Sequence, residues 1–258
     1  LLLPGLLLLG LAFLLPIFYV LSLAFEGEAG PGLGNFARFL GDAYYLQVAW
    51  RTIRLSLIIT LISALIGFPY AYIAARAGRS LRLWLIVLLV LPLMTSVVVR
   101  TFGWMVLLTR NGLVPDVFRA LGLAGRNFTL MQTEYAIVVG LVQVLLPFMT
   151  LSILGVVMKI DTRLEEAART MGCTFLQTLR TVVLPLALPG IVAGSLLVFT
   201  LSVSSFVTPS LLGGVRIPVI AASIYDQVTQ TLDWPFAAAQ STILLVGILL
   251  ILAPYMKV

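Results

Sequence analysis

Charged and small residues, rare elsewhere in this chain, gather between Thr162 and Pro185 in the stretch TRLEEAARTMGCTFLQTLRTVVLP. Thr162 followed by Glu165 fits a capping box, which predicts that a helix begins there. Glu165 and Arg169 stand at i and i+4 with the acid first, an arrangement that stabilises a helix. Gly172 predicts the end of this helix, because glycine readily adopts the left-handed backbone that follows a last turn.

The same stretch predicts a second helix. Thr174 and Gln177 form another capping box, and the helix that they open is expected to reach about Leu184, where prolines end it. The prediction is a helix, a glycine turn and a second helix in a polar loop at about residues 159–185. On these features alone, the loop could also be an ordinary linker between two membrane spans.

The composition excludes several kinds of chemistry. The chain has no histidine and a single cysteine, Cys173, which rules out a disulfide within the chain, a histidine-based triad and a Cys/His metal cluster. It has no GxxxxGK[ST] loop, so we expect no ATP to bind through a Walker motif. The sequence therefore predicts no catalytic residue, no metal ligand and no cofactor-binding residue in this chain.

Hydrophobic residues make up 61% of the 258 residues and charged residues 10%, against roughly 25% charged residues in soluble domains. Apolar runs of about twenty residues predict membrane-spanning helices. The net charge of +6 then fits basic residues that flank spans better than a nucleic-acid partner. We expect one all-α membrane domain over residues 1–258, with six spans at residues 1–25, 52–75, 83–108, 133–158, 189–212 and 236–256.

Two connecting segments also carry a helical pattern. Residues 35–40, NFARFL, are amphipathic and are expected to lie at the membrane surface. A short helix is expected around residues 220–229. The segment 1–25 is interpreted as a span, because it lacks the basic start of a signal peptide and its apolar part is too long.

Six spans place both termini on one side of the membrane, but basic residues alone do not say which side. Each side carries eight of them. The short loop at residues 76–82 holds three, Arg76, Arg79 and Arg82, and short loops weigh most, so this side is expected to be cytoplasmic.

Charged residues inside apolar spans are functional candidates by default. Arg54, Arg100 and Glu134 all fall near the outer ends of their predicted spans, so they either snorkel or pair near the surface, or they line the outer mouth of a pathway. Two aromatic residues and one acid in the outer loop join them as candidates. The outer-mouth candidates are Arg100, Glu134, Tyr225, Asp226 and Trp234.

The deeper polar residues are uncharged. Gln143 lies near the middle of the fourth predicted span, and Ser202, Ser205 and Pro209 would share one face of the fifth at i, i+3 and i+7. Such a face serves either helix packing or a translocation path, since membrane helices pack through small residues. Phe206, next to this face, is a candidate hydrophobic gate.

A longer pattern identifies the loop. Glu166-Ala167-Ala168, Gly172, Val182 and Leu184-Pro185 follow the EAA–x3–G–x9–I–x–LP spacing, with Val182 in place of isoleucine as the one departure. This pattern resembles the signature of the membrane subunits of binding-protein-dependent ABC importers. The resemblance implies the fold of a type I (MetI-like) importer permease and a cytoplasmic loop. It also implies these ATPase-coupling residues: Glu165, Glu166, Ala167, Ala168, Arg169, Gly172, Leu184 and Pro185.

The resemblance implies partners as well. It predicts two cytoplasmic ATPase subunits that bind ATP and Mg, a second permease subunit, identical or related, and an extracytoplasmic solute-binding protein. The chain would be a multi-pass protein of the bacterial inner membrane, part of a transporter and not an enzyme.

Other segments resemble spermidine/putrescine-type permeases: residues 100–105 (RTFGWM), 110–113 (RNGL), 205–209 (SFVTP) and 211–214 (LLGG). This resemblance implies a polyamine as the solute, while relatives import opines, phosphonates or iron. A secondary transporter would be expected to have inverted repeats and ion sites at the midplane, and a membrane enzyme would need clustered acid, base or nucleophile groups. The sequence has neither feature.

Overall fold

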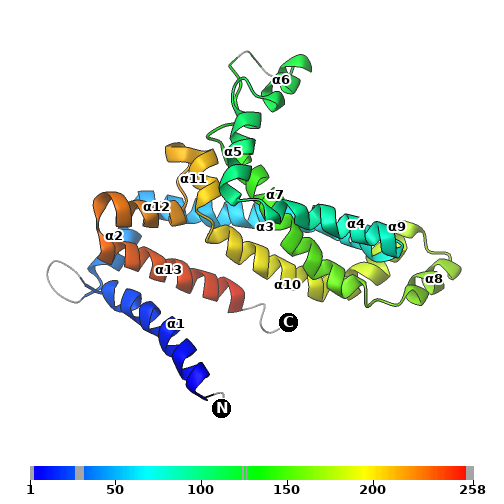
Figure 1. Cartoon of the computed structure of the whole chain (residues 1–258), viewed down its shortest axis with the longest axis horizontal. Helices are drawn as coiled ribbons and strands as arrows, with labels where there is room; N and C mark the ends of the chain where they lie inside the picture. Colours follow the sequence, from blue (N-terminus) through cyan, green and yellow to red (C-terminus); the bar gives the residue numbers. More distant parts are fainter. Residues whose placement is uncertain (1–2, 27–31, 124, 126, 254–258) are drawn as a thin grey trace. The chain divides into compact units, whose positions relative to one another are not determined.

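The structure is a computed structural model that describes residues 3–26, 32–123, 125 and 127–253, and within those ranges its secondary structure is entirely helical (Figure 1). The chain forms two compact units, each described by itself here. We call residues 1–52 with 218–258 the terminal unit and residues 53–217 the central unit. One long helix, α3 (Ala43–Arg76), has residues in both units.

In the terminal unit, α1, α2 and α12 pack on α13. The unit comprises α1 (Leu3–Leu23), α2 (Gly34–Gly41), the start of α3, α12 (Ile220–Asp226), a π turn (Gln227–Thr231) and α13 (Trp234–Leu252). A helix is confirmed at residues 35–40 as α2: Phe39 is 2% exposed, and Arg38 lies over the Phe236 ring and pairs with Asp233 at 2.8 Å. The predicted short helix is confirmed as α12, which the π turn extends to Thr231.

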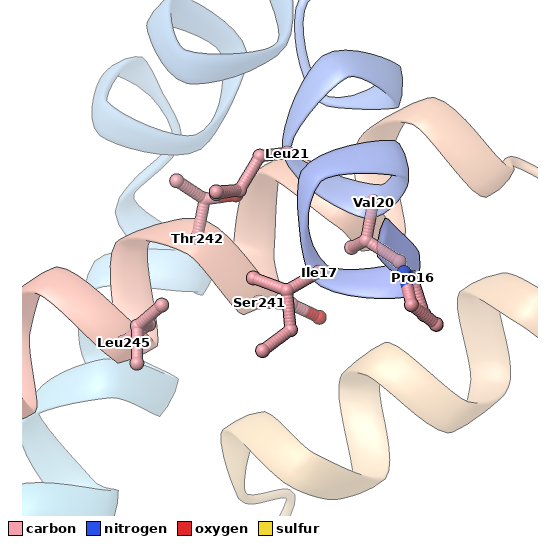
Figure 2. A pocket seen from close by; sticks show the side chains of 7 residues that line it. All are labelled: Pro16, Ile17, Val20, Leu21, Ser241, Thr242 and Leu245. Carbon is pink, nitrogen blue, oxygen red and sulfur yellow. The ribbon is translucent and has the colours of Figure 1, made fainter. Parts of the chain in front are cut away.

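A shallow pocket of about 260 Å³ lies between α1 and α13, lined by residues that include Pro16, Leu21 and Leu245 (Figure 2). Its only polar side chains, Ser241 and Thr242, donate hydrogen bonds to carbonyls one turn earlier in α13. The pocket therefore presents an apolar wall, which suits contact with lipid.

In the central unit, α7 packs along α10, and Figure 1 draws these two helices side by side in green and yellow. More than half of the most apolar window of α7 is buried, a larger share than in the other long apolar helices of the chain. The elements after α3 are α4 (Arg79–Val90), a 3₁₀ turn (Leu91–Met94), α5 (Val97–Leu108), α6 (Leu113–Ala120), α7 (Glu134–Val157), α8 (Thr162–Thr170), α9 (Phe175–Thr178), a π turn (Leu179–Val183), α10 (Leu184–Val203) and α11 (Val207–Gly213).

Among the described residues, four helices are long and apolar enough to cross a membrane, or up to six if each of two broken helix pairs counts as one span. The predicted span 133–158 matches α7 closely, and the predicted span 236–256 corresponds to α13 within the described range. The predicted span 52–75 is part of the longer α3.

The predicted span 83–108 is not one helix. The segment from α4 to residue 94 and the segment that begins with α5 meet at 95°. Pro92 lacks a backbone N–H and lies in the 3₁₀ turn that follows α4. Thr95, after this turn, has an extended conformation. The Thr95 hydroxyl donates to the Pro92 carbonyl at 2.7 Å, which fixes the break.

The predicted span 189–212 is also wrong in its limits. The helix runs from Phe175 to Val203 without ending at the prolines. A proline clashes with the carbonyl one turn before it, and the wider π turn over residues 179–183 makes room for Pro185. The helix ends where the Ser204 hydroxyl donates to the Thr200 carbonyl at 2.9 Å, and α11 follows as a separate helix.

Two glycines four residues apart bring α10 against α7. A Cβ atom on Gly190 would lie 2.9 Å from Val156 Cγ2, and one on Gly194 would lie 2.8 Å from Met149 Sδ. The Gly190 position leaves no room for a side chain, because the Ser152 carbonyl oxygen would also lie 3.0 Å away, while at Gly194 the Met149 side chain would have to move. Small residues at this spacing are a common way for membrane helices to approach closely.

We expect Gly194→Leu to destabilise the protein by about 1–3 kcal/mol, because the added atoms force α10 away from α7. Gly155→Leu is the matched control, since Gly155 lies on α7 with open space around its Cβ position. Thermal unfolding of the detergent-solubilised protein measures the difference. Equal melting temperatures for the two variants would contradict the packing described here.

Candidate functional site

The polar loop between α7 and α10 folds as a short helix, a turn and the start of a second helix. The first helix, α8, is capped by Asp161, whose carboxylate accepts a hydrogen bond from the Arg163 N–H at 2.9 Å. The predicted capping box of Thr162 with Glu165 is therefore wrong, and the residue that caps the helix is Asp161, one position earlier. A carboxylate is an effective cap, since it accepts a backbone N–H and also interacts favourably with the helix dipole.

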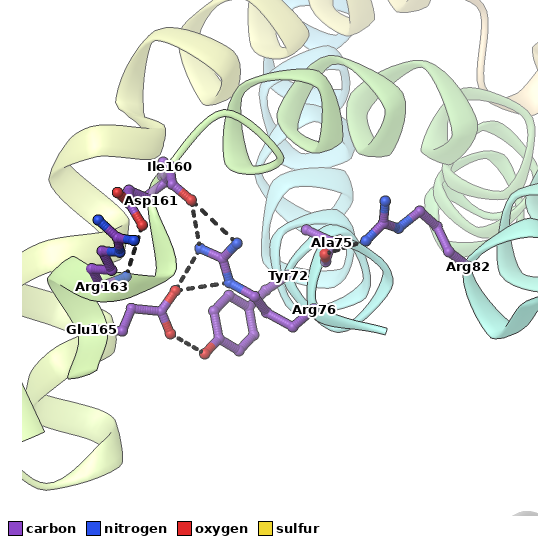
Figure 3. A network of polar contacts seen from close by, with 8 residues as sticks. All are labelled: Tyr72, Ala75, Arg76, Arg82, Ile160, Asp161, Arg163 and Glu165. Atoms are coloured by element: carbon purple, nitrogen blue, oxygen red, sulfur yellow. Dashed lines mark hydrogen bonds and ion pairs between the residues drawn. The ribbon is translucent and has the colours of Figure 1, made fainter. Parts of the chain in front are cut away.

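The side chain of Glu165, 6% exposed, turns back toward α3 (Figure 3). Its Oε1 accepts from Arg76 Nε at 2.8 Å and from Arg76 Nη2 at 2.5 Å, and its Oε2 accepts from the Tyr72 hydroxyl at 2.7 Å. Arg76 also donates to the Ile160 carbonyl at 3.3 Å. Glu165 therefore pairs with Arg76 and Tyr72 in place of the predicted partner Arg169.

Ring contacts extend this network to α9. The Tyr72 and Phe175 rings meet edge to face at 5.9 Å between centroids. The guanidinium of Arg169 lies over the Phe175 ring, 5.8 Å from its centroid. The end of α3 therefore contacts both helices of the loop.

The turn between the helices follows the prediction. Gly172 has φ of +88°, its N–H donates to the Arg169 carbonyl at 2.9 Å, and the Cys173 N–H donates to the Ala168 carbonyl at 3.1 Å. These two bonds make a Schellman motif, which satisfies carbonyls at the end of α8. The second capping box is also confirmed: Gln177 Oε1 accepts from the Thr174 N–H at 2.8 Å, and Thr174 Oγ1 accepts from the Gln177 N–H at 3.4 Å.

The two faces of α8 differ in what they offer a partner. Glu165 and Ala168 are buried against this chain, whereas Glu166, Ala167 and Arg169 are exposed. The exposed apolar side chains on this loop include Leu164, 48% exposed, and Met171, 79% exposed, next to the open Gly172 turn. Leu184 and Pro185, at the start of α10, are exposed as well.

Sequence reasoning did not assign Tyr72, Arg76 or Arg82 to this site. Arg82 Nη2 donates to the Ala75 carbonyl at 2.8 Å and to the Ala77 carbonyl at 3.1 Å, so it caps the end of α3. A signal was available: arginines at the end of a long apolar helix and just after it are well placed to bind its last carbonyls. They were counted only as charges that orient the chain.

Arg54 on α3 and Glu134 at the start of α7 form an ion pair, and both residues belong to the central unit. Pairing near the surface was one of the two interpretations of these charges. Arg100 donates through Nη2 to the Thr95 carbonyl at 3.4 Å, while its buried Nε and Nη1 have no hydrogen-bond partner in the described part of the chain.

The deeper polar residues of the central unit lie on α5, α7, α10 and α11, or in the break before α11. Gln143 on α7 accepts from Trp104 Nε1 on α5 at 3.4 Å. The hydroxyls of Thr101 on α5 and Thr208 on α11 lie 3.3 Å apart. Ser202 is 4% exposed. These contacts join α5, α7 and α11 through uncharged groups.

Ser202, Ser205 and Pro209 do not share one helical face. Ser202 is near the end of α10, Ser205 lies in the break after it, and Pro209 is on α11. The prediction carried the helical period through the break, which the Ser204 side chain and the turn at residues 204–206 interrupt. Phe206 occupies the position just before α11, without a side-chain capping bond, and its role as a gate stays a prediction.

Three outer-mouth candidates belong to the terminal unit. Tyr225 and Asp226 are exposed at the end of α12, and Trp234, 54% exposed, begins α13. Arg100 and Glu134 belong to the central unit. Within each unit the candidates stand on helix ends.

The sequence of this chain is similar to those of transport proteins. Residues 63–255 match the family model described as "Binding-protein-dependent transport system inner membrane component". The spermidine/putrescine transport system permease protein PotB of Haemophilus influenzae is 34% identical over 253 residues, which cover 95% of this chain and 87% of that protein. PotB of Escherichia coli is 34% identical over 225 residues, which cover 87% and 82%.

One solved structure is similar over almost the whole chain. It is a chain of a bacterial alginate ABC transporter in complex with an alginate pentasaccharide-bound periplasmic protein. The TM-score is 0.81 with 20% sequence identity, over 98% of this chain and 90% of that one. The match confirms the predicted all-helical permease fold.

The cap of α8 gives a direct test of the loop geometry. We expect Asp161→Ala to destabilise the first turn of α8 by about 1 kcal/mol and to speed amide hydrogen exchange of Arg163 about fivefold, because that N–H loses its acceptor. Thr162→Ala is the control and should leave the exchange rate unchanged. Faster exchange of the Glu165 N–H in Thr162→Ala would restore the capping box predicted from the sequence, because Thr162 would bond that N–H.

Proposed function

This chain belongs to the family of binding-protein-dependent transport system inner membrane components, and from that membership we propose how it is driven and what it carries. It is a multi-pass permease subunit of an ABC importer in the inner membrane, not an enzyme. Our proposal is that it forms part of the translocation path for a polyamine and is driven by a separate ATPase through residues 159–185.

The exposed face of α8 supports the coupling part of the proposal. A short amphipathic helix can lay one face in a groove of another protein. Glu166, Ala167 and Met171 are exposed near the open turn at Gly172, while Glu165 and Ala168 are buried in their own chain. Ala167 allows close approach, and Glu166 offers a charge to a basic group of the ATPase.

The proposed assembly contains this chain, a second permease subunit, identical or related, two cytoplasmic ATPase subunits and an extracytoplasmic solute-binding protein. The ATPases would bind ATP and Mg, and we expect this chain to bind no cofactor. ATP-driven closure of the ATPases would displace α8 and rock the membrane helices between inward and outward states.

A polyamine is proposed as the solute because two PotB proteins, named for spermidine and putrescine, are similar over most of their length. The uncharged amide of Gln143, which is only partly buried, suits passage of a small polar solute, since tight binding in the middle of a path slows release. Asp226, Tyr225 and Trp234 offer a carboxylate and aromatic faces, which attract ammonium groups.

Arg100 favours a second candidate. Its Nε and Nη1 have no acceptor among the described residues, and a guanidinium pairs well with a carboxylate or phosphonate. A permease of the same architecture that imports an anionic solute, such as an opine or a phosphonate, is therefore the alternative. Repulsion of a polycation by Arg100 is the physical difference between the two.

The solute is tested by uptake into proteoliposomes that contain the complete transporter. Labelled spermidine and putrescine are compared with an opine, a phosphonate and ferric iron, and the partner binding protein is tested by thermal shift against the same compounds. We expect ATP-dependent uptake of a polyamine and stabilisation of the binding protein by it. Uptake of an anion but not of polyamines would support the alternative.

The coupling role is tested by Gly172→Val and Glu166→Lys. Valine at φ of +88° strains the turn by about 1–3 kcal/mol, and lysine reverses the charge offered to the ATPase, so we expect uptake to fall at least about tenfold while the subunit still inserts. Gly78→Val is the control, because Gly78 has φ of −59° and open space. Normal uptake by both loop variants would refute the coupling role.

A further inference from the structure

The coupling helix α8 is joined by side chains to a helix that is distant in sequence. Along the chain, α8 follows α7 and precedes α9, but the buried bonds of Glu165 go to Tyr72 and Arg76 at the end of α3. Arg76 also donates to the Ile160 carbonyl, just before α8 (Figure 3). One guanidinium therefore contacts both the first turn of α8 and the segment that leads into it.

Buried side-chain bonds give α8 a second connection to the central unit, besides its backbone. The side chains of Arg76 and Glu165 are 19% and 8% exposed, and a buried ion pair leaves an uncompensated charge when it is separated. The two guanidinium donors on one oxygen and the Tyr72 hydroxyl on the other also fix the orientation of the carboxylate.

The end of α3 is itself held firmly. Arg82, on α4, donates to three carbonyls of the last residues of α3 and the junction after it, Ala74, Ala75 and Ala77. Ala74 and Ala75 are buried. A force on Arg76 therefore acts on an ordered helix end, and the start of α4 is bonded to the same end.

We propose that Glu165, Arg76 and Tyr72 are positioning residues that make α8 and the end of α3 move together, so that displacement of the coupling helix is delivered directly to α3. The inference rests on the proposed coupling function and adds the route that the movement takes through this chain. On this route α3 responds to the ATPase through side-chain contacts, and α7 and α10 respond through the loop backbone.

The test uses the complete transporter in proteoliposomes and measures solute moved per ATP hydrolysed. We expect Arg76→Gln to lower this ratio at least about tenfold, because a buried carboxylate loses its partner and releases α8 from α3. Tyr72→Phe should lower it less, and the double variant Arg76→Glu with Glu165→Arg should recover at least half of the wild-type ratio. Arg79→Gln is the control, since Arg79 is an exposed arginine at the same junction.

A merely structural role predicts a different result, in which transport and ATP hydrolysis fall in proportion and their ratio stays constant. An unchanged ratio in Arg76→Gln would overturn the proposal. If Arg76→Gln does not accumulate in membranes, Tyr72→Phe decides: a reduced ratio supports the route through α3, and an unchanged ratio overturns it.

Failure of the underlying function would look different. In that case the ATPase would not co-purify with the wild-type permease, or both Gly172→Val and Glu166→Lys would transport normally. A wild-type complex that transports, together with an unchanged ratio in Arg76→Gln, would reject only the route through α3.

Discussion

The close contact between α7 and α10 is the constraint on which the central unit depends. Gly190 leaves no room for a side chain against Val156 and the Ser152 carbonyl, and Gly194 lies against Met149, so the two helices pack closely. The polar loop leaves α7 and returns into α10, and both of its ends are therefore fixed by one tight interface. A loop with fixed ends can hold a short helix in a definite place, which a freely mobile linker could not do.

The loop then divides its side chains between two tasks. One face of α8 is buried: the Glu165 carboxylate is fully bonded by Arg76 and Tyr72, and Ala168 packs inside. The other face carries Glu166 and Ala167 in the open. Burying a carboxylate is unfavourable unless its bonds are satisfied, so the network at Glu165 fixes which face remains for a partner. The exposed face and the buried anchor are consequences of the same arrangement.

Breaks in the helices also follow from local chemistry. The turn that contains Pro92 is a tight 3₁₀ turn, because proline cannot donate a backbone hydrogen bond. The helix α10 ends where the Ser204 hydroxyl bonds back to the Thr200 carbonyl. Pro185, in contrast, remains inside a helix because a π turn makes room for it. Pro92 therefore lies where one helix ends, and Pro185 lies within another, where the preceding turn is widened.

The sequence by itself determined the membrane class, the helical fold, the Gly172 turn and the second capping box, because each depends on composition or on residues a few positions apart. The tertiary structure decided what depends on distant partners. Glu165 was expected to pair with Arg169 four residues away, but it binds Arg76, because a buried guanidinium and a tyrosine hydroxyl satisfy a carboxylate better than an exposed neighbour on the same helix. Ser202 and Pro209 were placed on one face by helical periodicity, and the break between them could be located only once the backbone hydrogen bonds around Ser204 were known.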